Sequence, residues 1–133
     1  MSHPAWTVRE SVCLFFSRLA LKSHQSGLIR HEMLSNMIFC VAKALDDRKF
    51  WRVRHSGMQV LNSLTSRTGN ITGAKLSEYE RKFSTGSNQQ YMLEALLPYK
   101  EKISQLAKKS LRDPEAKVTA IGSTVVEALS WWP

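Results

Sequence analysis

The richest cluster of chemically capable residues lies between positions 48 and 54, where four basic residues surround two aromatic ones. Guanidinium and ammonium groups bind phosphate or carboxylate oxygens, and an indole ring stacks on a nucleic-acid base or packs against a protein. The segment is therefore a candidate contact surface for a partner protein or a nucleic acid. Its candidate contact residues are Arg48, Lys49, Trp51 and Arg52.

The same segment also has a structural interpretation. Trp51 and Trp6 both begin the sequence Trp-x-Val-Arg, so they occupy equivalent positions in a repeated pattern. Side chains at such positions pack between neighbouring repeats, where each repeat buries its apolar face. We therefore expect both tryptophans to be wedges between repeats and Arg54 to form an ion pair between repeats. Arg48 and Arg52 are expected to make surface contacts.

No pattern in the sequence indicates a metal, a nucleotide or a catalytic nucleophile. The four histidines and two cysteines lack the spacing of zinc ligands. The stretch 69–76 resembles a phosphate-binding loop only in part, because its glycines are wrongly spaced and no Ser or Thr follows Lys75. A Gly-x-Ser-x-Gly nucleophile motif is also absent. We therefore expect no enzymatic activity, no cofactor and no metal.

Length and composition indicate one folded domain over residues 1–133. Apolar residues make up 43% of the chain, and the net charge of +8 favours acidic partners, whether nucleic acid or protein. A solvated basic surface is the simpler explanation of this charge. The chain has no run of about 18 apolar residues, so no membrane span is expected, and its first residues do not resemble a secretory signal.

The two cysteines favour a reducing compartment. Cys13 and Cys40 both fall within helical patterns, so we expect two buried thiols rather than a disulfide. Together with the lack of a secretory signal, this predicts an intracellular protein, cytoplasmic or nuclear.

An apolar pattern that occurs three times predicts the architecture. Its offsets of 0, 4, 7, 8 and 11 residues define one face of an α-helix. The first two copies start about 45 residues apart, a spacing typical of two-helix repeats. The copies are Val8, Val12, Phe15, Phe16 and Leu19; Val53, Gly57, Val60, Leu61 and Leu64; and Val118, Gly122, Val125, Val126 and Leu129. We expect a continuous inner core formed by Val12, Phe16, Val60, Leu61, Leu64, Val126 and Leu129.

Helical periodicity divides the chain into a first helix over residues 5–24 and two helix pairs, within 27–67 and 89–132. Short polar turns within each pair predict that its two helices are antiparallel. Pro98 should kink or split the helix that contains it, because its ring clashes with the preceding turn. Two polar stretches with glycine predict that residues 68–88 are a loop insertion between repeats.

This alternation of helices resembles the HEAT and armadillo repeat families. Those repeats pair an outer with an inner helix, place Asp in the turn between them, and carry Val-Arg early in the inner helix. Here Asp113 lies five residues before Val118, and Arg9 and Arg54 each follow a valine. Asp47 is one residue out of register with the family spacing.

The resemblance covers most of the chain except 68–88, and it implies an all-α fold, an α-solenoid of antiparallel helix pairs with about two and a half repeats. In such a solenoid Trp6, Arg9, Arg54 and Asp113 are structural residues between repeats. The resemblance further implies a non-catalytic helical-repeat scaffold segment that mediates protein–protein interaction within a larger intracellular assembly.

Two other functions remain open. One is nucleic-acid binding through a basic face centred on residues 48–54, which a salt-dependent binding curve would reveal because phosphate contacts weaken steeply with salt. The other is catalysis, since some DNA glycosylases resemble HEAT repeats. Such a reaction needs a carboxylate beside aromatic side chains, and Asp46 or Asp47 near Trp51 is the only candidate.

The two ends of the pattern are apolar. The first copy has no partner helix before it, and the last helix ends at Trp131 and Trp132. Terminal repeats normally carry polar caps, because a repeat buries its face only against a neighbour. We therefore expect the chain to belong to a longer solenoid, to self-associate through its terminal helices, or to bind a partner there.

Overall fold

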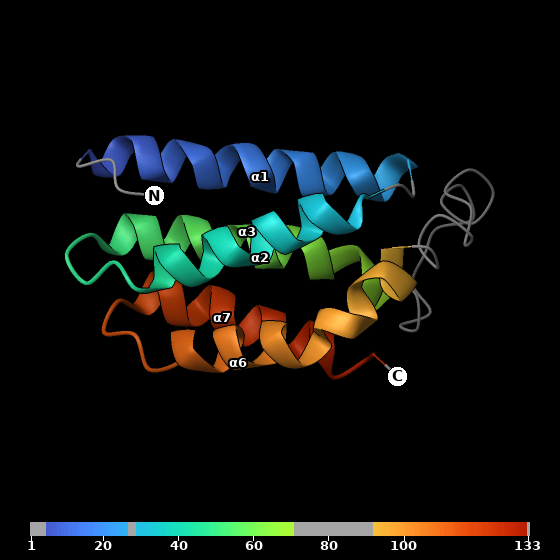
Figure 1. The fold of residues 1–133 in the computed structure, drawn as a ribbon. Coiled ribbons are helices and arrows are strands. Elements are labelled where there is room, and N and C mark those ends of the chain that lie inside the picture. Colours follow the sequence, from blue (N-terminus) through green and yellow to red (C-terminus); the bar gives the residue numbers. More distant parts are fainter. Residues whose placement is uncertain (1–4, 27–28, 71–91, 133) are drawn as a thin grey trace.

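The computed structural model of this chain describes residues 5–26, 29–70 and 92–132, and in these residues it is all-helical, without a strand (Figure 1). This confirms the predicted all-α class. The elements are α1 (Trp6–Ser26), α2 (His31–Leu45), α3 (Trp51–Asn70), a helical stretch over residues 92–96, the 3₁₀ turn η1 (Leu97–Tyr99), α6 (Lys100–Ser110) and α7 (Ala116–Leu129).

Helix α3 lies at the centre of the arrangement. It packs extensively against α1, α2 and α7, whereas α6 packs mainly against α7. Helices α1 and α2 contact each other much less than each contacts α3. In Figure 1, α1 (blue) lies along one side of α3, and the α6–α7 pair (orange and red) lies along the other. The core is therefore organised around α3.

The amphipathic pattern of α2 shows why these helices form. Its buried residues recur at steps of three and four and thus make one apolar stripe. Glu32 in its first turn and Lys43 in its last turn have the charges that a helix dipole favours at each end. The buried stripe consists of Leu34, Met37, Ile38, Val41, Ala44 and Leu45.

Pro98 interrupts the helix that precedes α6, as predicted. It lies in η1, where a tighter 3₁₀ turn separates residues 92–96 from α6. Proline lacks an amide hydrogen, and its ring clashes with the carbonyl of the preceding helical turn. An undistorted α-helix therefore cannot continue through it. The break changes the direction of the chain before α6 (Figure 1).

Some boundaries differ from those predicted. The first helix covers Trp6–Ser26 rather than 5–24, and α3 continues to Asn70. Residues 68–70 are therefore helical and not part of a loop insertion, because the three polar residues there do not stop a helix that is already propagating. The rest of the proposed insertion, residues 71–88, lies outside the described part of the chain.

The predicted core positions are only partly correct. Val60, Leu61 and Leu64 are completely buried and Leu129 is nearly so. Phe16 and Val126 are only half-buried at the edge of the core, and Val12 is also only half-buried.

Helix α1 is rotated relative to the predicted register. Cys13 and Ala20 are fully buried, and the Ser17 hydroxyl lies 2.6 Å from the Ser63 hydroxyl of α3. These residues are spaced by four and three, so they form one narrow stripe of small side chains. Small side chains let two helices approach closely, and this stripe faces α3 in place of Val12 and Phe16.

Two glycines occupy the closest helix contacts. A Cβ atom on Gly57 of α3 would lie 2.8 Å from the Cβ of Ala44 in α2. A Cβ atom on Gly122 of α7 would overlap the Ser110 hydroxyl at the end of α6. Each glycine therefore permits its helix to pack against the preceding helix. Both stand at the second position of the repeated pattern, where the first copy has Val12.

Candidate partner-binding groove

The turn between α2 and α3 is built around Asp47. Its Oδ1 accepts hydrogen bonds from the backbone amides of Lys49 (3.1 Å) and Phe50 (3.0 Å). Its Oδ2 accepts two more from Arg9 of α1, at 3.1 Å from Nε and 2.7 Å from Nη2. Burial alone would raise the pKa of Asp47, but these hydrogen bonds and the Arg9 charge outweigh it and lower the pKa. Asp47 is thus an anion that joins the turn to α1.

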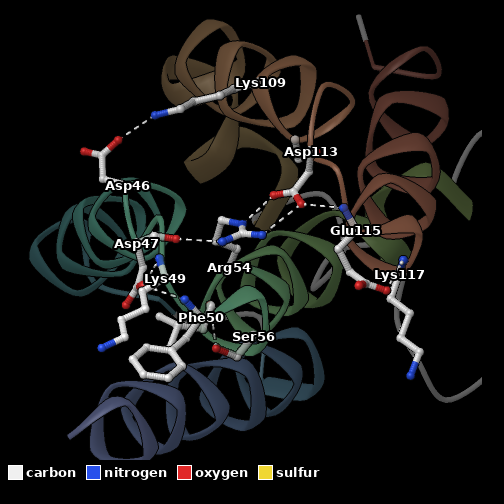
Figure 2. A network of polar contacts seen from close by, with 12 residues as sticks. Asp46, Asp47, Lys49, Phe50, Arg54, Ser56, Lys109, Asp113, Glu115 and Lys117 are labelled. Carbon is white, nitrogen blue, oxygen red and sulfur yellow. Dashed lines mark hydrogen bonds and ion pairs between the residues drawn. The ribbon is translucent and has the colours of Figure 1, made fainter.

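The turn between α6 and α7 repeats this design with Asp113. Its Oδ1 accepts from the Glu115 amide at 2.9 Å, and its two carboxylate oxygens accept from Arg54 at 2.6 Å and 3.1 Å. Arg54 also donates to the Asp47 carbonyl at 2.8 Å, so its guanidinium bridges both turns (Figure 2). Burial opposes ionisation of Asp113, but the bonds from Arg54 and the Glu115 amide lower its pKa.

A second recurring contact places a cation over each tryptophan. The Arg52 guanidinium lies 5.3 Å from the centre of the Trp6 ring, and the Lys117 ammonium lies 5.1 Å from that of Trp51. Both distances are within the range of cation–π attraction. Arg52 and Lys117 each precede the valine that opens a copy of the repeated pattern. The structure therefore brings equivalent residues together twice.

The candidate contact residues lie at this end of the bundle, but they are not a free basic surface. Arg52 is exposed, yet it donates to Glu10 at 3.2 Å. Lys49 extends over the ring of Phe50 at 5.5 Å, and Trp51 is half-buried. Arg48 is exposed. The local positive charge is therefore partly neutralised.

The two tryptophans have different surroundings. Trp6 stacks on Phe50, with ring centres 5.4 Å apart and planes inclined by 22°. Trp51 meets His55 edge-on, with ring centres 6.0 Å apart. Each tryptophan is half-buried beside a neighbouring helix or turn.

The two carboxylates considered for catalysis are both held by cations. Asp47 pairs with Arg9, and the exposed Asp46 accepts from the Lys109 ammonium at 2.6 Å (Figure 2). The hydrogen bond and charge of Lys109 lower the pKa of Asp46. A carboxylate with a lowered pKa is a weaker base near neutral pH. Both carboxylates are therefore already engaged by neighbouring cations.

A groove of about 540 Å³ lies between α1 and α2. It exists because both helices rest on α3 while making few contacts with each other. Its walls are mostly apolar, and its charged residues lie toward the end near the α2–α3 turn. The lining residues are Arg9, Val12, Cys13, Phe16, Asn36, Phe39, Cys40, Lys43, Ala44, Asp46, Asp47 and Val53.

Two phenylalanines make this region unusually apolar for a solvent-facing surface. Phe39 on the groove is 61% exposed, and Phe15 on α1 is 60% exposed. Phe15 borders a shallower hollow with Val8, and Val12 lines both hollows. Large exposed apolar surfaces with polar edges are typical of interaction sites. We name the surface formed by Val8, Val12, Phe15, Phe16 and Phe39 the α1–α2 groove surface.

Two features of the sequence point to the α1–α2 groove surface, although the sequence-based predictions did not include it. Val12 stands where the other two copies of the pattern have glycines that permit a helix to pack closely. Phe39 lies outside the buried stripe of α2. A large apolar residue outside the apolar stripe of an amphipathic helix indicates a second contact face.

Other kinds of site find no support in the described residues. No group of three or more His, Cys, Asp or Glu side chains there is arranged to hold a metal ion. None of the helices in those ranges combines the length and apolarity needed to cross a membrane. Comparisons with protein-family models, with curated proteins and with solved structures give no match to this chain.

Proposed function

We propose that this chain is a non-catalytic helical scaffold segment that binds an amphipathic helix of an acidic partner protein in the groove between α1 and α2. The observation that carries the proposal is an apolar groove of about 540 Å³ with two phenylalanines more than half exposed beside it. Helix-in-groove recognition needs such a surface, into which anchors spaced by three, four and seven residues insert their side chains.

Charge determines the kind of helix that fits. The chain carries a net charge of +8. On α1, Arg18 and Lys22 are exposed on the same helix as Phe15. Lys43 lines the groove on α2, and the two aspartates that also line it, Asp46 and Asp47, are each paired with a cation. An amphipathic helix with acidic residues beside its apolar stripe complements this combination.

Recurring contacts support a helical-repeat architecture for the scaffold. The ion pair of Arg9 with Asp47 recurs as Arg54 with Asp113, and the glycine contact of α3 with α2 recurs between α7 and α6. In the proposed solenoid α1 is an inner helix, followed by the pairs α2–α3 and α6–α7, about two and a half repeats of the HEAT/armadillo type.

The proposed setting is a larger intracellular assembly, cytoplasmic or nuclear. Apolar side chains near both ends of the described region are open to solvent: Val8 on α1 is 39% exposed, and Trp131 after α7 is 52% exposed. Such side chains support contact with other members of an assembly. A second copy of the chain is an alternative occupant of the α1–α2 groove surface. Sedimentation at micromolar concentration, with and without Phe15→Glu, distinguishes self-association from a monomer that awaits another protein.

Nucleic-acid binding through residues 48–54 is the alternative function. The exposed cations Arg48 and Lys49 favour it. The engagement of Arg52 with Glu10 and of Arg54 with Asp113 argues against it, because each phosphate contact would compete with an ion pair already formed.

A displayed library of random amphipathic helices tests the proposal. The library is panned in parallel against the unmodified chain, Phe39→Glu, and the control Leu111→Glu, which alters an exposed apolar residue outside the groove. We expect enriched sequences to combine an apolar stripe with acidic residues. Binding should weaken at least about tenfold in Phe39→Glu, which corresponds to about 1.4 kcal/mol, and remain unchanged in Leu111→Glu.

Equal enrichment on the unmodified chain and on Phe39→Glu would reject the groove as the site. Single-stranded DNA serves as the second probe. DNA binding that falls steeply with salt and is lost in Arg48→Glu, while the helix library shows no enrichment, would support the nucleic-acid alternative instead.

A further inference from the structure

Two cysteines from different helices meet in the α1–α2 groove. Cys13 of α1 and Cys40 of α2 both line it, and their sulfur atoms are 3.7 Å apart. Both are free thiols in this structure, Cys13 fully buried and Cys40 half-buried. The expectation of two buried thiols is therefore correct for Cys13 but only partly so for Cys40. Their proximity across two helices was not visible in the sequence.

We propose that Cys13 and Cys40 form a reversible disulfide site, which a low-molecular-weight disulfide of the glutathione class oxidises. The inference goes beyond partner binding and does not depend on which molecule occupies the groove. A disulfide needs a sulfur–sulfur distance of about 2 Å, so the two atoms must approach by less than 2 Å. Side-chain rotation and a small shift of α1 against α2 supply this movement, because the two helices contact each other only weakly.

The two thiols are chemically different. The hydrogen bond between them, together with burial, raises the pKa of Cys13 far above its ordinary value. The same hydrogen bond lowers the pKa of Cys40 despite its partial burial. Because the thiolate is the attacking species, Cys40 is the nucleophile. Cys40 is also the more accessible of the two.

The reaction proceeds in two exchanges. The Cys40 thiolate attacks one sulfur of the reagent, a bond forms between them, the reagent's own sulfur–sulfur bond breaks, and one thiolate leaves. Cys13 then transfers its proton to solvent or to the leaving thiolate and attacks the Cys40 sulfur, which releases the second reagent thiolate. In total two cysteine thiols are oxidised and one reagent disulfide is reduced to two thiols. An excess of reduced reagent reverses both steps.

The resulting bond would connect the two walls of the groove. It joins α1 to α2 across the sparse contact between them and closes a loop from residue 13 to residue 40. A cross-link of this kind removes conformations from the unfolded chain and so stabilises the folded one. We expect the midpoint of thermal unfolding to rise by about 5–10 °C on oxidation.

The test uses the full chain in glutathione buffers that range from fully reduced to fully oxidised. Remaining thiols are alkylated, and intact mass and non-reducing peptide maps identify the products. We expect the unmodified chain to lose both reactive thiols together, with no glutathione retained and with a linked Cys13–Cys40 peptide. The yield should not change on tenfold dilution, because the bond forms within one chain.

Two single variants separate the roles of the cysteines. Cys13→Ala should retain one glutathione on Cys40, because the resolving thiol is missing. Cys40→Ala should react at least about tenfold more slowly, because the remaining thiol is fully buried. Circular dichroism establishes that each variant is folded; if either is not, the linked peptide and the thermal shift of the unmodified chain decide alone.

Three results would overturn the proposal. The first is a chain that stays fully alkylated at every glutathione ratio. The second is a linkage that forms only between chains and disappears on dilution. The third is equal reactivity of the two folded variants, which would show that neither cysteine is preferred as the nucleophile.

Discussion

Helix α1 differs from the helix pairs α2–α3 and α6–α7 at one position of the repeated pattern. In α2–α3 and α6–α7, a glycine of the second helix lies so close to the first helix that an added Cβ would collide with it. In α1 the equivalent residue is Val12, which lines an open groove. At this one position of the repeated pattern, a glycine accompanies a helix face closed by its neighbour and a valine accompanies one that lines an open groove.

The largest expected contrast is between the sealed core and the open groove. Leu61→Ala should reduce the free energy of unfolding by about 2–5 kcal/mol, because Leu61 is fully buried in the central helix α3. Phe39→Ala removes a larger side chain, yet it should change stability by only about 0.5 kcal/mol, because Phe39 is 61% exposed. Urea unfolding of both variants measures the contrast. Similar losses in the two would show that Phe39 belongs to the core.

The recurring ion pairs offer the next contrast. Asp113→Ala should cost about 2–3 kcal/mol, because it removes charged hydrogen bonds to the Arg54 guanidinium and leaves a cation whose side chain is only 12% exposed. Asp46→Ala breaks the exposed pair with Lys109 and should cost about 0–1 kcal/mol. Chemical unfolding under matched conditions compares the two. An Asp113→Ala chain as stable as Asp46→Ala would mean that the bridge between the turns is dispensable.

The same carboxylates should make stability depend on pH. The pKa values of Asp47 and Asp113 are lower in the folded chain than the unfolded value of about 3.9. Their contribution is therefore complete above about pH 5, and it falls as the pH drops through 3.9 and on through the lower folded-state pKa values. Unfolding curves between pH 6 and pH 3 should show this loss, and a smaller one in Asp113→Asn. A stability that rises on acidification would contradict the assignment.

Adding a methyl group where Gly57 contacts α2 should have a smaller effect on stability, and its sign tests how close the contact is. Gly57→Ala would normally stabilise an exposed helix by about 1 kcal/mol. Here it should instead destabilise the chain by about 1–2 kcal/mol, because the new Cβ would lie 2.8 Å from that of Ala44. The compensating change Ala44→Gly frees that space. A double-mutant cycle should show favourable coupling between the two changes, and strict additivity would argue against the close contact.

The smallest expected effect on stability concerns His55, where the surroundings of Trp51 differ from those of Trp6. Glu10 accepts a hydrogen bond from Arg52 on the Trp6 side, whereas the equivalent position on the Trp51 side is His55. Burial lowers the pKa of His55, and the positive charge of Lys117 lowers it further. His55→Glu should therefore introduce an ion pair with Lys117, partly offset by repulsion from Glu10 and Glu115, and stabilise the chain by at most about 0.5 kcal/mol. In a Lys117→Ala background the gain should vanish; if it persists, the contact with Lys117 is not its source.

Local patterns predicted the helices well. The apolar stripe placed α2, and Pro98 correctly marked the break before α6, because both signals act within a few residues. The rotation of α1 was predicted wrongly. The five offsets of the apolar pattern locate the buried face of a helix only to within one or two residues. Ser17 and Cys13 show that small side chains determine which part of that face touches α3.

The candidate site could be predicted only in part. Basic and aromatic residues at 48–54 did gather at one end of the bundle, but spacing cannot show that Glu10 neutralises Arg52 from another helix. The groove was missed for the same reason, since it depends on how far apart α1 and α2 settle on α3. Such distances arise from tertiary packing between segments far apart in the sequence.

The central position of α3 also bears on the order in which this fold assembles. Helices α2 and α3 are joined by a short turn, so their contacts form at a small entropic cost of loop closure. The contacts of α3 with α7 require closure of a much longer segment of chain. Nucleation should therefore begin at the α2–α3 hairpin, with α7 docking later. Mutations in the α2–α3 contact should slow folding, whereas those in the α3–α7 contact should mainly accelerate unfolding.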